Sequence, residues 1–222
     1  LGSDARVDVD TIMKSAEDWA AWLKPMICDA GATVTDALAR GEKVLFEGAQ
    51  GAMLDVDSGT YPYVTSSVTT AGGVCTGLGV GPTVINEVWG ITKAYTTRVG
   101  AGPFPTKLEG EEAERLRKAG GEFGATTGRP RDCGWLDLPA LRYAARLNGM
   151  TGLCVTKLDI LAMLPEVKIC RSYRDGVLPG THDLSKAVPE YEVLEGWGQT
   201  DWANRLSEIR RYEDLPGPVR AY

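Results

Sequence analysis

Histidine, paired cysteines, long apolar runs and excess positive charge are all scarce or missing in this chain of 222 residues. Its single histidine, His182, cannot build a histidine-rich metal site, and we expect it in an exposed turn. The five cysteines form no CxxC pair, which argues against a zinc site or disulfide framework and favours a reducing cytoplasm. No apolar run approaches the roughly 18 residues of a membrane span, and no leader segment is recognisable, so we expect no membrane partner.

The charge balance excludes a further class. A net charge of −6 and an isoelectric point near 5.0 argue against a general nucleic-acid-binding protein. Apolar residues make up 43% of the chain, which is enough for a sizeable core. The 27 glycines cluster in a few segments, and this indicates loops shaped around ligands.

What the chain does contain is an alternation of helix and strand patterns. We predict helices near 11–23, 34–40, 83–90, 111–119, 138–148 and 201–212, and strands near 43–46, 91–99, 152–156 and 167–173. Asp10 and Asp137 are expected to cap the first and fifth helices, and Trp19 and Trp22 to lie in the core. The alternation predicts one α/β domain over residues 1–222, with a largely parallel sheet and flanking helices.

The most informative segment is 124–131, with the sequence GATTGRPR. Glycines let successive backbone N–H groups point into one concavity that binds an anion. The guanidinium groups of Arg129 and Arg131 grip carboxylates or phosphates in a bidentate way. The segment therefore predicts an anion-binding loop, and the alternative is a plain turn with solvated arginines.

A second candidate is the step Lys157-Leu158-Asp159, which follows the predicted strand at 152–156. Ligands bind at the carboxyl edge of an open α/β sheet. A carboxylate there can accept from N1–H and the exocyclic amine of guanine together, and adenine offers no such pair. The alternatives are a helix cap with a solvated lysine, or an unrelated GTPase-like regulator.

Two polar residues complete the candidates from residue chemistry alone. The amide of Gln50 offers an acceptor and two donors, which complement the N1/O6 edge of hypoxanthine, or else it is a polar turn residue. Thr65 has the hydroxyl to bond a phosphate, or else it satisfies its own turn.

Taken in order, five segments of the chain closely resemble adenylosuccinate synthetase. They are 46–51 (FEGAQG), 59–67 (GTYPYVTSS), 97–106 (TRVGAGPFPT), 124–131 (GATTGRPR) and 156–159 (TKLD). The resemblance implies a P-loop-NTPase-like fold and the GTP-dependent joining of IMP and L-aspartate in AMP synthesis. It also implies a homodimer and a requirement for Mg²⁺.

The resemblance also implies a role for individual residues. Gln50 would help to form the 6-oxyanion of IMP, Thr65 would hold the IMP phosphate, and Val99 would touch the ribose. The loop would bind aspartate, with Arg129 also contacting IMP and Arg131 lying near GTP; its members are Ala125, Thr126, Thr127, Gly128, Arg129, Pro130 and Arg131. Lys157, Leu158 and Asp159 would read the guanine.

The departures from the family pattern matter equally. No Gly-x-x-x-x-Gly-Lys phosphate loop occurs, so the catalytic aspartate, lysine and histidine of the family and its Mg²⁺ ligands have no counterpart here. Ser58, Val68 and Asp132 replace residues that are common in the family, and Asp132 places negative charge beside the anion loop. We therefore expect a fragment of a larger domain with an incomplete fold, inactive alone. The alternative is a non-catalytic module that binds IMP or aspartate.

Overall fold

The computed structural model describes residues 8–124, 128–180, 182–198 and 208–222. Its helices are α1 (Val9–Leu23), α2 (Ala30–Ala39), α3 (Gly73–Leu78), α4 (Gly110–Gly120), α5 (Leu138–Asn148), α6 (Leu158–Leu161) and α7 (Gly217–Ala221). Its strands are β1 (Trp89–Lys93), β2 (Thr96–Arg98), β3 (Asp132–Gly134), β4 (Leu136–Asp137), β5 (Gly152–Thr156), β6 (Glu166–Tyr173) and β7 (Pro189–Glu195). Short 3₁₀ turns include η2 (Ala52–Leu54), η3 (Pro82–Val84) and η7 (Tyr212–Asp214).

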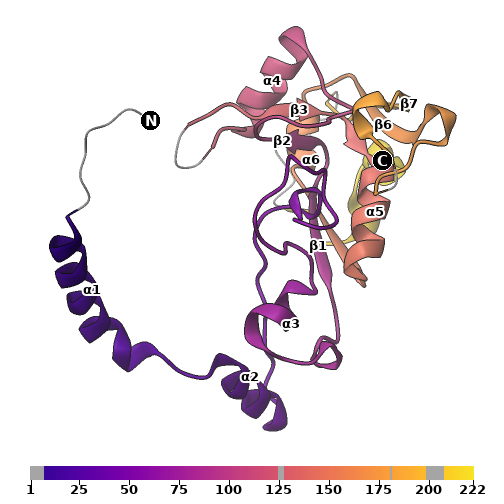
Figure 1. The fold of residues 1–222 in the computed structure, drawn as a ribbon. Helices are drawn as coiled ribbons and strands as arrows, with labels where there is room; N and C mark the ends of the chain where they lie inside the picture. The colour runs from indigo at the N-terminus through magenta and orange to yellow at the C-terminus, as the bar shows by residue number, and fades with distance from the viewer. Residues whose placement is uncertain (1–7, 125–127, 181, 199–207) are drawn as a thin grey trace.

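The strands combine parallel and antiparallel pairs. β1 runs parallel to β5, and β4 runs parallel to β6, so the predicted α/β class with parallel pairing is confirmed. β2 and β3 pair antiparallel, and β7 extends the β4–β6 sheet antiparallel to β6. The described strands thus form three small sheets, connected by the helices shown in Figure 1.

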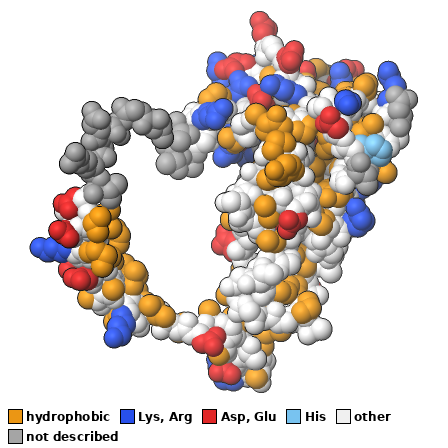
Figure 2. Space-filling model, in the orientation of Figure 1, with side chains coloured by type: hydrophobic (Ala, Val, Ile, Leu, Met, Phe, Trp, Pro, Cys, Tyr) orange, Lys and Arg blue, Asp and Glu red, His pale blue; other side chains and the backbone are white. Residues whose placement is uncertain are grey.

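The first helix stands apart from the body of the molecule (Figure 1). None of residues 8–54 is buried, and Trp19 and Trp22 are 64% and 65% exposed, so their prediction as core residues is wrong. The reason is that α1 is amphipathic, but its apolar side packs on nothing within the described chain. Figure 2 shows hydrophobic side chains gathered along one side of this helix. The cap is Asp8 rather than Asp10, because the Asp8 carboxylate accepts from the N–H groups of Asp10 and Thr11.

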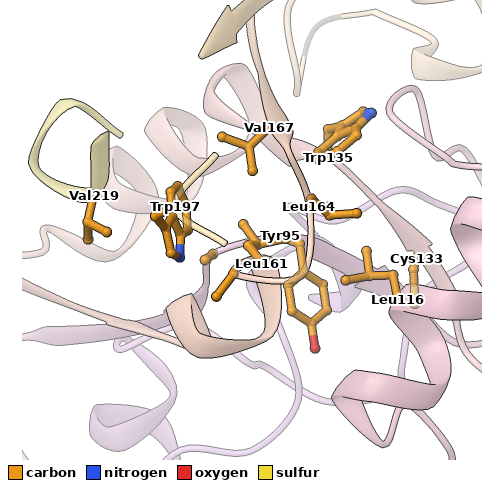
Figure 3. Close-up of a cluster of buried hydrophobic side chains, with 11 residues drawn as sticks. Tyr95, Leu116, Cys133, Trp135, Leu161, Leu164, Val167, Trp197 and Val219 are labelled. Carbon is orange, nitrogen blue, oxygen red and sulfur yellow. The ribbon is translucent and has the colours of Figure 1, made fainter. Parts of the chain in front are cut away.

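The main core lies between the helices α4, α6 and α7, the strands β3 and β6, and the turn that joins β1 to β2. Its buried members include Tyr95, Leu116, Cys133, Trp135, Leu161, Val167, Trp197 and Val219, as Figure 3 shows. The Trp197 indole donates its Nε1–H to the Leu158 carbonyl at 2.9 Å and meets the Tyr222 ring edge-on at 5.3 Å. The C-terminal residue Tyr222 therefore packs on the core through Trp197, beside the start of α6.

Two predicted helices are confirmed where local chemistry defines them. α4 and α5 lie where the sequence places them, and the buried Asp137 carboxylate caps α5 by accepting from Ala140 N–H at 3.0 Å. Tyr173 donates to the same carboxylate at 2.6 Å. Burial raises the pKa of Asp137, and these hydrogen bonds only partly offset that effect.

Other predictions about elements are wrong. Residues 83–90 are no helix, since they contain part of η3 and the start of β1, whose pairing with β5 decides the backbone. Residues 43–46 form no strand, because no described strand lies beside them, and Leu45 is 92% exposed. The predicted strand at 152–156 is confirmed as β5, and four of its five residues are exposed. The predicted helix at 201–212 lies largely outside the described residues and stays a prediction; its last residue, Tyr212, begins η7.

Candidate functional site

Two backbone positions have an unusual conformation. Within the described ranges, Gln50 (φ 61°) and Lys157 (φ 64°) are the non-glycine residues with positive φ. A side chain in the left-handed region costs roughly 1–2 kcal/mol, and such strain concentrates at ligand-binding positions. Both residues were candidates from the sequence, so the backbone singles out the same two positions as the residue chemistry.

Thr65 and Val99 line one cavity of about 340 Å³, although the sequence separates them widely. The Thr65 N–H donates to the Leu54 carbonyl at 2.8 Å, which holds this segment against η2 just after the Gln50 loop. The remaining lining residues are Leu54, Tyr63, Val64, Arg98 and Ala101. The structure therefore brings together the predicted phosphate-binding and ribose-contacting residues.

Arg98 is a residue of this cavity that the sequence analysis missed. Its guanidinium donates to Thr60 Oγ1 at 3.1 Å and to the carbonyls of Tyr63 and Ala101 at 3.2 and 3.1 Å. Burial lowers the pKa of Arg98, but an arginine stays charged. Gly102 must be glycine here, because its φ is 124° and an added Cβ would lie 2.1 Å from Arg98 Nη2. That glycine, in the 97–106 motif, was the available signal for a tightly packed arginine.

The anion loop is the turn of a hairpin. Gly124 N–H donates to the Arg129 carbonyl, and Gly128 N–H donates to the Gly124 carbonyl, both at 2.8 Å. Gly128 has φ 63°, which requires the freedom of glycine. Arg129 and Pro130 are exposed, whereas Arg131 turns inward. Ala125, Thr126 and Thr127 lie outside the described residues.

Arg131 meets a cluster of charges around the buried side chain of Glu122. The Glu122 carboxylate, 1% exposed, accepts from Lys93 Nζ at 2.7 Å on both oxygens and from the Tyr95 hydroxyl at 2.6 Å. Arg131 Nη1 donates to it at 3.0 Å, and Lys157 Nζ lies 3.9 Å away. Burial acts to raise the pKa of Glu122, but the hydrogen bonds from Lys93, Tyr95 and Arg131 together hold it below its ordinary value.

The predicted guanine step sits at the same point because of the sheet. β1 and β5 run parallel with Lys93 opposite Thr156, so Lys93 and Lys157 emerge at the same edge. Lys157 Nζ donates to the Gly120 carbonyl at 2.5 Å. Leu158 is half-buried and packs against the main core, and Asp159 is exposed in the first turn of α6.

Strand β2 connects this cluster to the cavity. Thr97 accepts from Lys93 Nζ at 2.9 Å, and the next residue, Arg98, lines the cavity with Thr65. Neighbouring residues of a strand point to opposite faces, so β2 presents one side chain to each site. The two groups of predicted residues are thus neighbours in the fold.

Comparison with known proteins identifies the family. The adenylosuccinate synthetase family model matches residues 2–222. This chain belongs to the adenylosuccinate synthetase family. An adenylosuccinate synthetase of Halothermothrix orenii is 49% identical over 97% of the chain, and one of Chromohalobacter salexigens is 51% identical over 99%.

Solved structures agree. The fully ligated adenylosuccinate synthetase of Plasmodium falciparum superposes with a TM-score of 0.89 at 38% identity, over 98% of this chain and 53% of that one. A cyanophage S-2L succinoaminodeoxyadenylate synthetase, bound to dGMP and dATP, gives a TM-score of 0.50 at 25% identity, over 59% of this chain and 40% of that one. The chain spans about half the length of the curated relatives that it matches, 51% for both bacterial proteins named here.

One departure from the adenylosuccinate synthetase pattern is compensated in the structure. The Asp132 carboxylate pairs with Lys107 Nζ at 2.9 Å, so its negative charge is partly neutralised beside the anion loop. Ser58 donates its backbone N–H to the Asp55 carboxylate at 2.9 Å, a contact that any residue type except proline can make.

The described residues contain neither a metal-binding cluster nor a membrane-spanning helix. No group of three or more His, Cys, Asp or Glu side chains in those ranges is arranged to hold a metal ion. None of the described helices combines the length and the hydropathy needed to cross a membrane.

Proposed function

We propose that this chain supplies the substrate-reading part of an adenylosuccinate synthetase, which joins IMP and L-aspartate at the expense of GTP in AMP synthesis. One observation carries the proposal. The Glu122 carboxylate gathers Arg131, predicted to bind aspartate, and Lys157, predicted to read guanine, at 3.0 and 3.9 Å. A ligase that brings an amino acid and a nucleotide to one reaction centre needs such neighbouring sites.

IMP would occupy the cavity between Thr65 and Val99, with its base at Gln50. The Thr65 hydroxyl and the half-buried positive charge of Arg98 suit a phosphate, and Val99 offers an apolar contact to the ribose. The Gln50 amide complements the N1/O6 edge and would favour charge on O6. The cavity and the strained backbone of Gln50 support this assignment.

Aspartate and GTP would bind on either side of the Glu122 cluster. In the proposal, the loop of Ala125 to Arg131 holds the aspartate carboxylates through Thr127, Arg129 and Arg131. Lys157 lays its aliphatic stem along the guanine, and Asp159 accepts from N1–H and the exocyclic amine. Arg129 also reaches IMP, and Arg131 also lies near GTP. The exposure of Asp159 leaves its carboxylate accessible to the base.

The proposed reaction has two steps. O6 of IMP, after loss of the N1 proton, attacks the γ-phosphorus of GTP and displaces GDP. The aspartate amine then attacks C6 and displaces phosphate, which forms adenylosuccinate. The Mg²⁺ ligands would lie in the half of the family protein that this chain does not match.

We further propose that residues 1–222 belong to one larger α/β domain of a cytoplasmic homodimer. The apolar residues of β1 and β5 support the first part: Ile91 is 79% exposed, and Leu153 and Val155 are 41% and 44% exposed. Parallel strands are ordinarily covered on both faces, so further chain is needed to complete this sheet. Five free thiols agree with a reducing compartment.

The test compares the chain alone with the chain joined to the unmatched half of the Halothermothrix orenii relative. Adenylosuccinate formation from IMP, aspartate and GTP is followed in both. We expect turnover only in the joined protein, and Gln50→Ala and Asp159→Asn to lower it by about 10²-fold or more. Asp57→Asn, at another loop carboxylate, is the matched control and is expected to stay within twofold.

Each result separates the alternatives. Turnover by the chain alone would contradict the claim that it needs the other half. IMP binding without turnover in the joined protein would favour a non-catalytic binding module. GTP binding that is indifferent to IMP and aspartate would favour an unrelated guanine-nucleotide regulator.

A further inference from the structure

Glu122 is the most heavily contacted ionisable group in the site, yet none of the proposed substrate contacts uses it. It follows α4 and directly precedes the anion loop, and its carboxylate is almost completely buried. Its side-chain partners are Lys93, Tyr95 and Arg131, with Lys157 at the limit of an ion pair. One cation is enough to neutralise a buried carboxylate, whereas three surround Glu122.

The four contacts fall into two kinds. The hydrogen bonds that Lys93 and Tyr95 donate to the Glu122 carboxylate are short, at 2.6–2.7 Å, and the Tyr95 side chain belongs to the core. The contacts of Arg131 and Lys157 with the same carboxylate are longer, at 3.0 and 3.9 Å, and the two side chains are 31% and 36% exposed. Lys93 and Tyr95 therefore fix the position of the Glu122 carboxylate, and the carboxylate in turn positions the side chains of Arg131 and Lys157.

The charge balance leaves both substrate-facing cations available. One carboxylate faces three cations, so two positive charges are uncompensated within the cluster. The Nε–H of Arg131 is also buried without a hydrogen-bond acceptor in the described structure. Arg131 therefore keeps positive charge for an incoming anion while Glu122 holds its guanidinium in place.

We propose that Glu122 is a positioning residue that couples the aspartate site to the guanine site through Arg131 and Lys157. This inference rests on the proposed function. When an aspartate carboxylate pairs with the Arg131 guanidinium, Glu122 loses one hydrogen-bond donor and binds Lys157 more tightly. The aliphatic part of Lys157 is then better positioned to pack on the guanine. Binding of aspartate thus strengthens binding of the guanine nucleotide, and the reverse holds by linkage.

The first test is structural and needs no ligand. Crystal structures of the full chain, as wild type and as Glu122→Gln, are compared. The variant keeps the size of the side chain and an acceptor for Tyr95 but loses the charge. We expect Arg131 and Lys157 to leave their wild-type positions while the backbone of β1, β5 and α4 stays in place. Unchanged positions of both side chains would overturn the inference.

The second test measures coupling directly. GDP affinity is titrated with and without saturating L-aspartate, using the chain joined to the unmatched half of the Halothermothrix orenii relative. In wild type we expect aspartate to tighten GDP binding about fivefold or more, and in Glu122→Gln the ratio is expected to fall to within twofold of one. Glu122→Asp, which keeps the charge, is expected to restore part of the coupling. Glu192→Gln, which breaks the exposed pair with Arg171, is the matched control.

A folding defect is separated from loss of coupling by a double variant. Glu122→Gln with Lys93→Met removes the buried charge and its tightest counter-charge together, so Lys93 is not left without its partner. We expect this variant to fold and still to lack coupling. Equal coupling in wild type and both charge-free variants would overturn the inference alone, whereas wild type that binds neither GDP nor aspartate would overturn the proposed function.

Discussion

The left-handed backbone at Lys157 allows a test that separates strain from side-chain contacts. Replacing Lys157 by alanine or by glycine removes the same bond to the Gly120 carbonyl. The two variants differ in how well they tolerate φ 64° and in how flexible they make the unfolded chain. Glycine relieves about 1–2 kcal/mol of left-handed strain, and it loses about 0.4–1 kcal/mol by making the unfolded chain more flexible.

The expected difference is therefore about 1 kcal/mol in favour of Lys157→Gly over Lys157→Ala. Urea unfolding followed by tryptophan fluorescence resolves this difference, and the melting temperature is expected to differ by about 2–4 °C. Gln50, with φ 61°, is expected to show the same order for its glycine and alanine variants.

Lys186 supplies the control, because it lies in η5 (Leu184–Lys186) and has no positive φ. There the order reverses, and Lys186→Gly is expected to be less stable than Lys186→Ala by about 0.4–1 kcal/mol. If alanine matches or exceeds glycine at both Lys157 and Gln50, neither backbone is strained, and the support that it gives to the binding assignments is lost.

Three further predictions concern the core, the buried charge and the open surface. Trp197→Ala is expected to lower the free energy of unfolding by about 3–5 kcal/mol, whereas Trp22→Ala on the exposed helix stays within about 0.5 kcal/mol; equal effects in urea unfolding would contradict the assigned core. The pKa of Glu122 is lower in the folded than in the unfolded state, so its negative charge stabilises the fold at pH values above the unfolded pKa of about 4.3. This stabilisation is lost as the pH falls through the folded pKa. The stability difference between wild type and Glu122→Gln is therefore expected to shrink with acidification, and a constant difference would refute this. The chain alone is expected to self-associate through its open apolar surface, and Leu45→Lys with Ile91→Lys to reduce association in sedimentation velocity; a monodisperse wild-type monomer would contradict this.

Local chemistry determined which parts of the fold were predictable. The cap at Asp137 and the amphipathic pattern after it specify α5 without help from distant residues. Residues 83–90 were misassigned because the parallel pairing of β1 with β5 is a long-range contact that no local pattern reveals. Leu45, Trp19 and Trp22 have the sequence pattern of buried residues, but the described chain contains nothing that covers them.

The site divides in the same way. Gln50, Thr65, Val99, Arg131 and Lys157 could be chosen from side-chain chemistry and the resemblance, and their roles remain predictions. Glu122 and Arg98 could not be chosen, because their importance arises from burial and from partners that lie far away in the sequence. An acidic residue beside a glycine-rich loop is too common a pattern to indicate a shared counter-charge.

The helix that stands apart has a practical consequence for observing this protein. Its two indoles, Trp19 and Trp22, lie in water, as does much of Trp89 on the uncovered strand β1, whereas Trp135 and Trp197 are enclosed. Emission from the first group reports whatever comes to cover these surfaces, and emission from the second reports whether the molecule is intact. Assembly, which covers exposed indoles, shifts the tryptophan emission maximum to shorter wavelength, and unfolding, which exposes buried indoles, shifts it to longer wavelength. Both can therefore be followed in the same unlabelled sample.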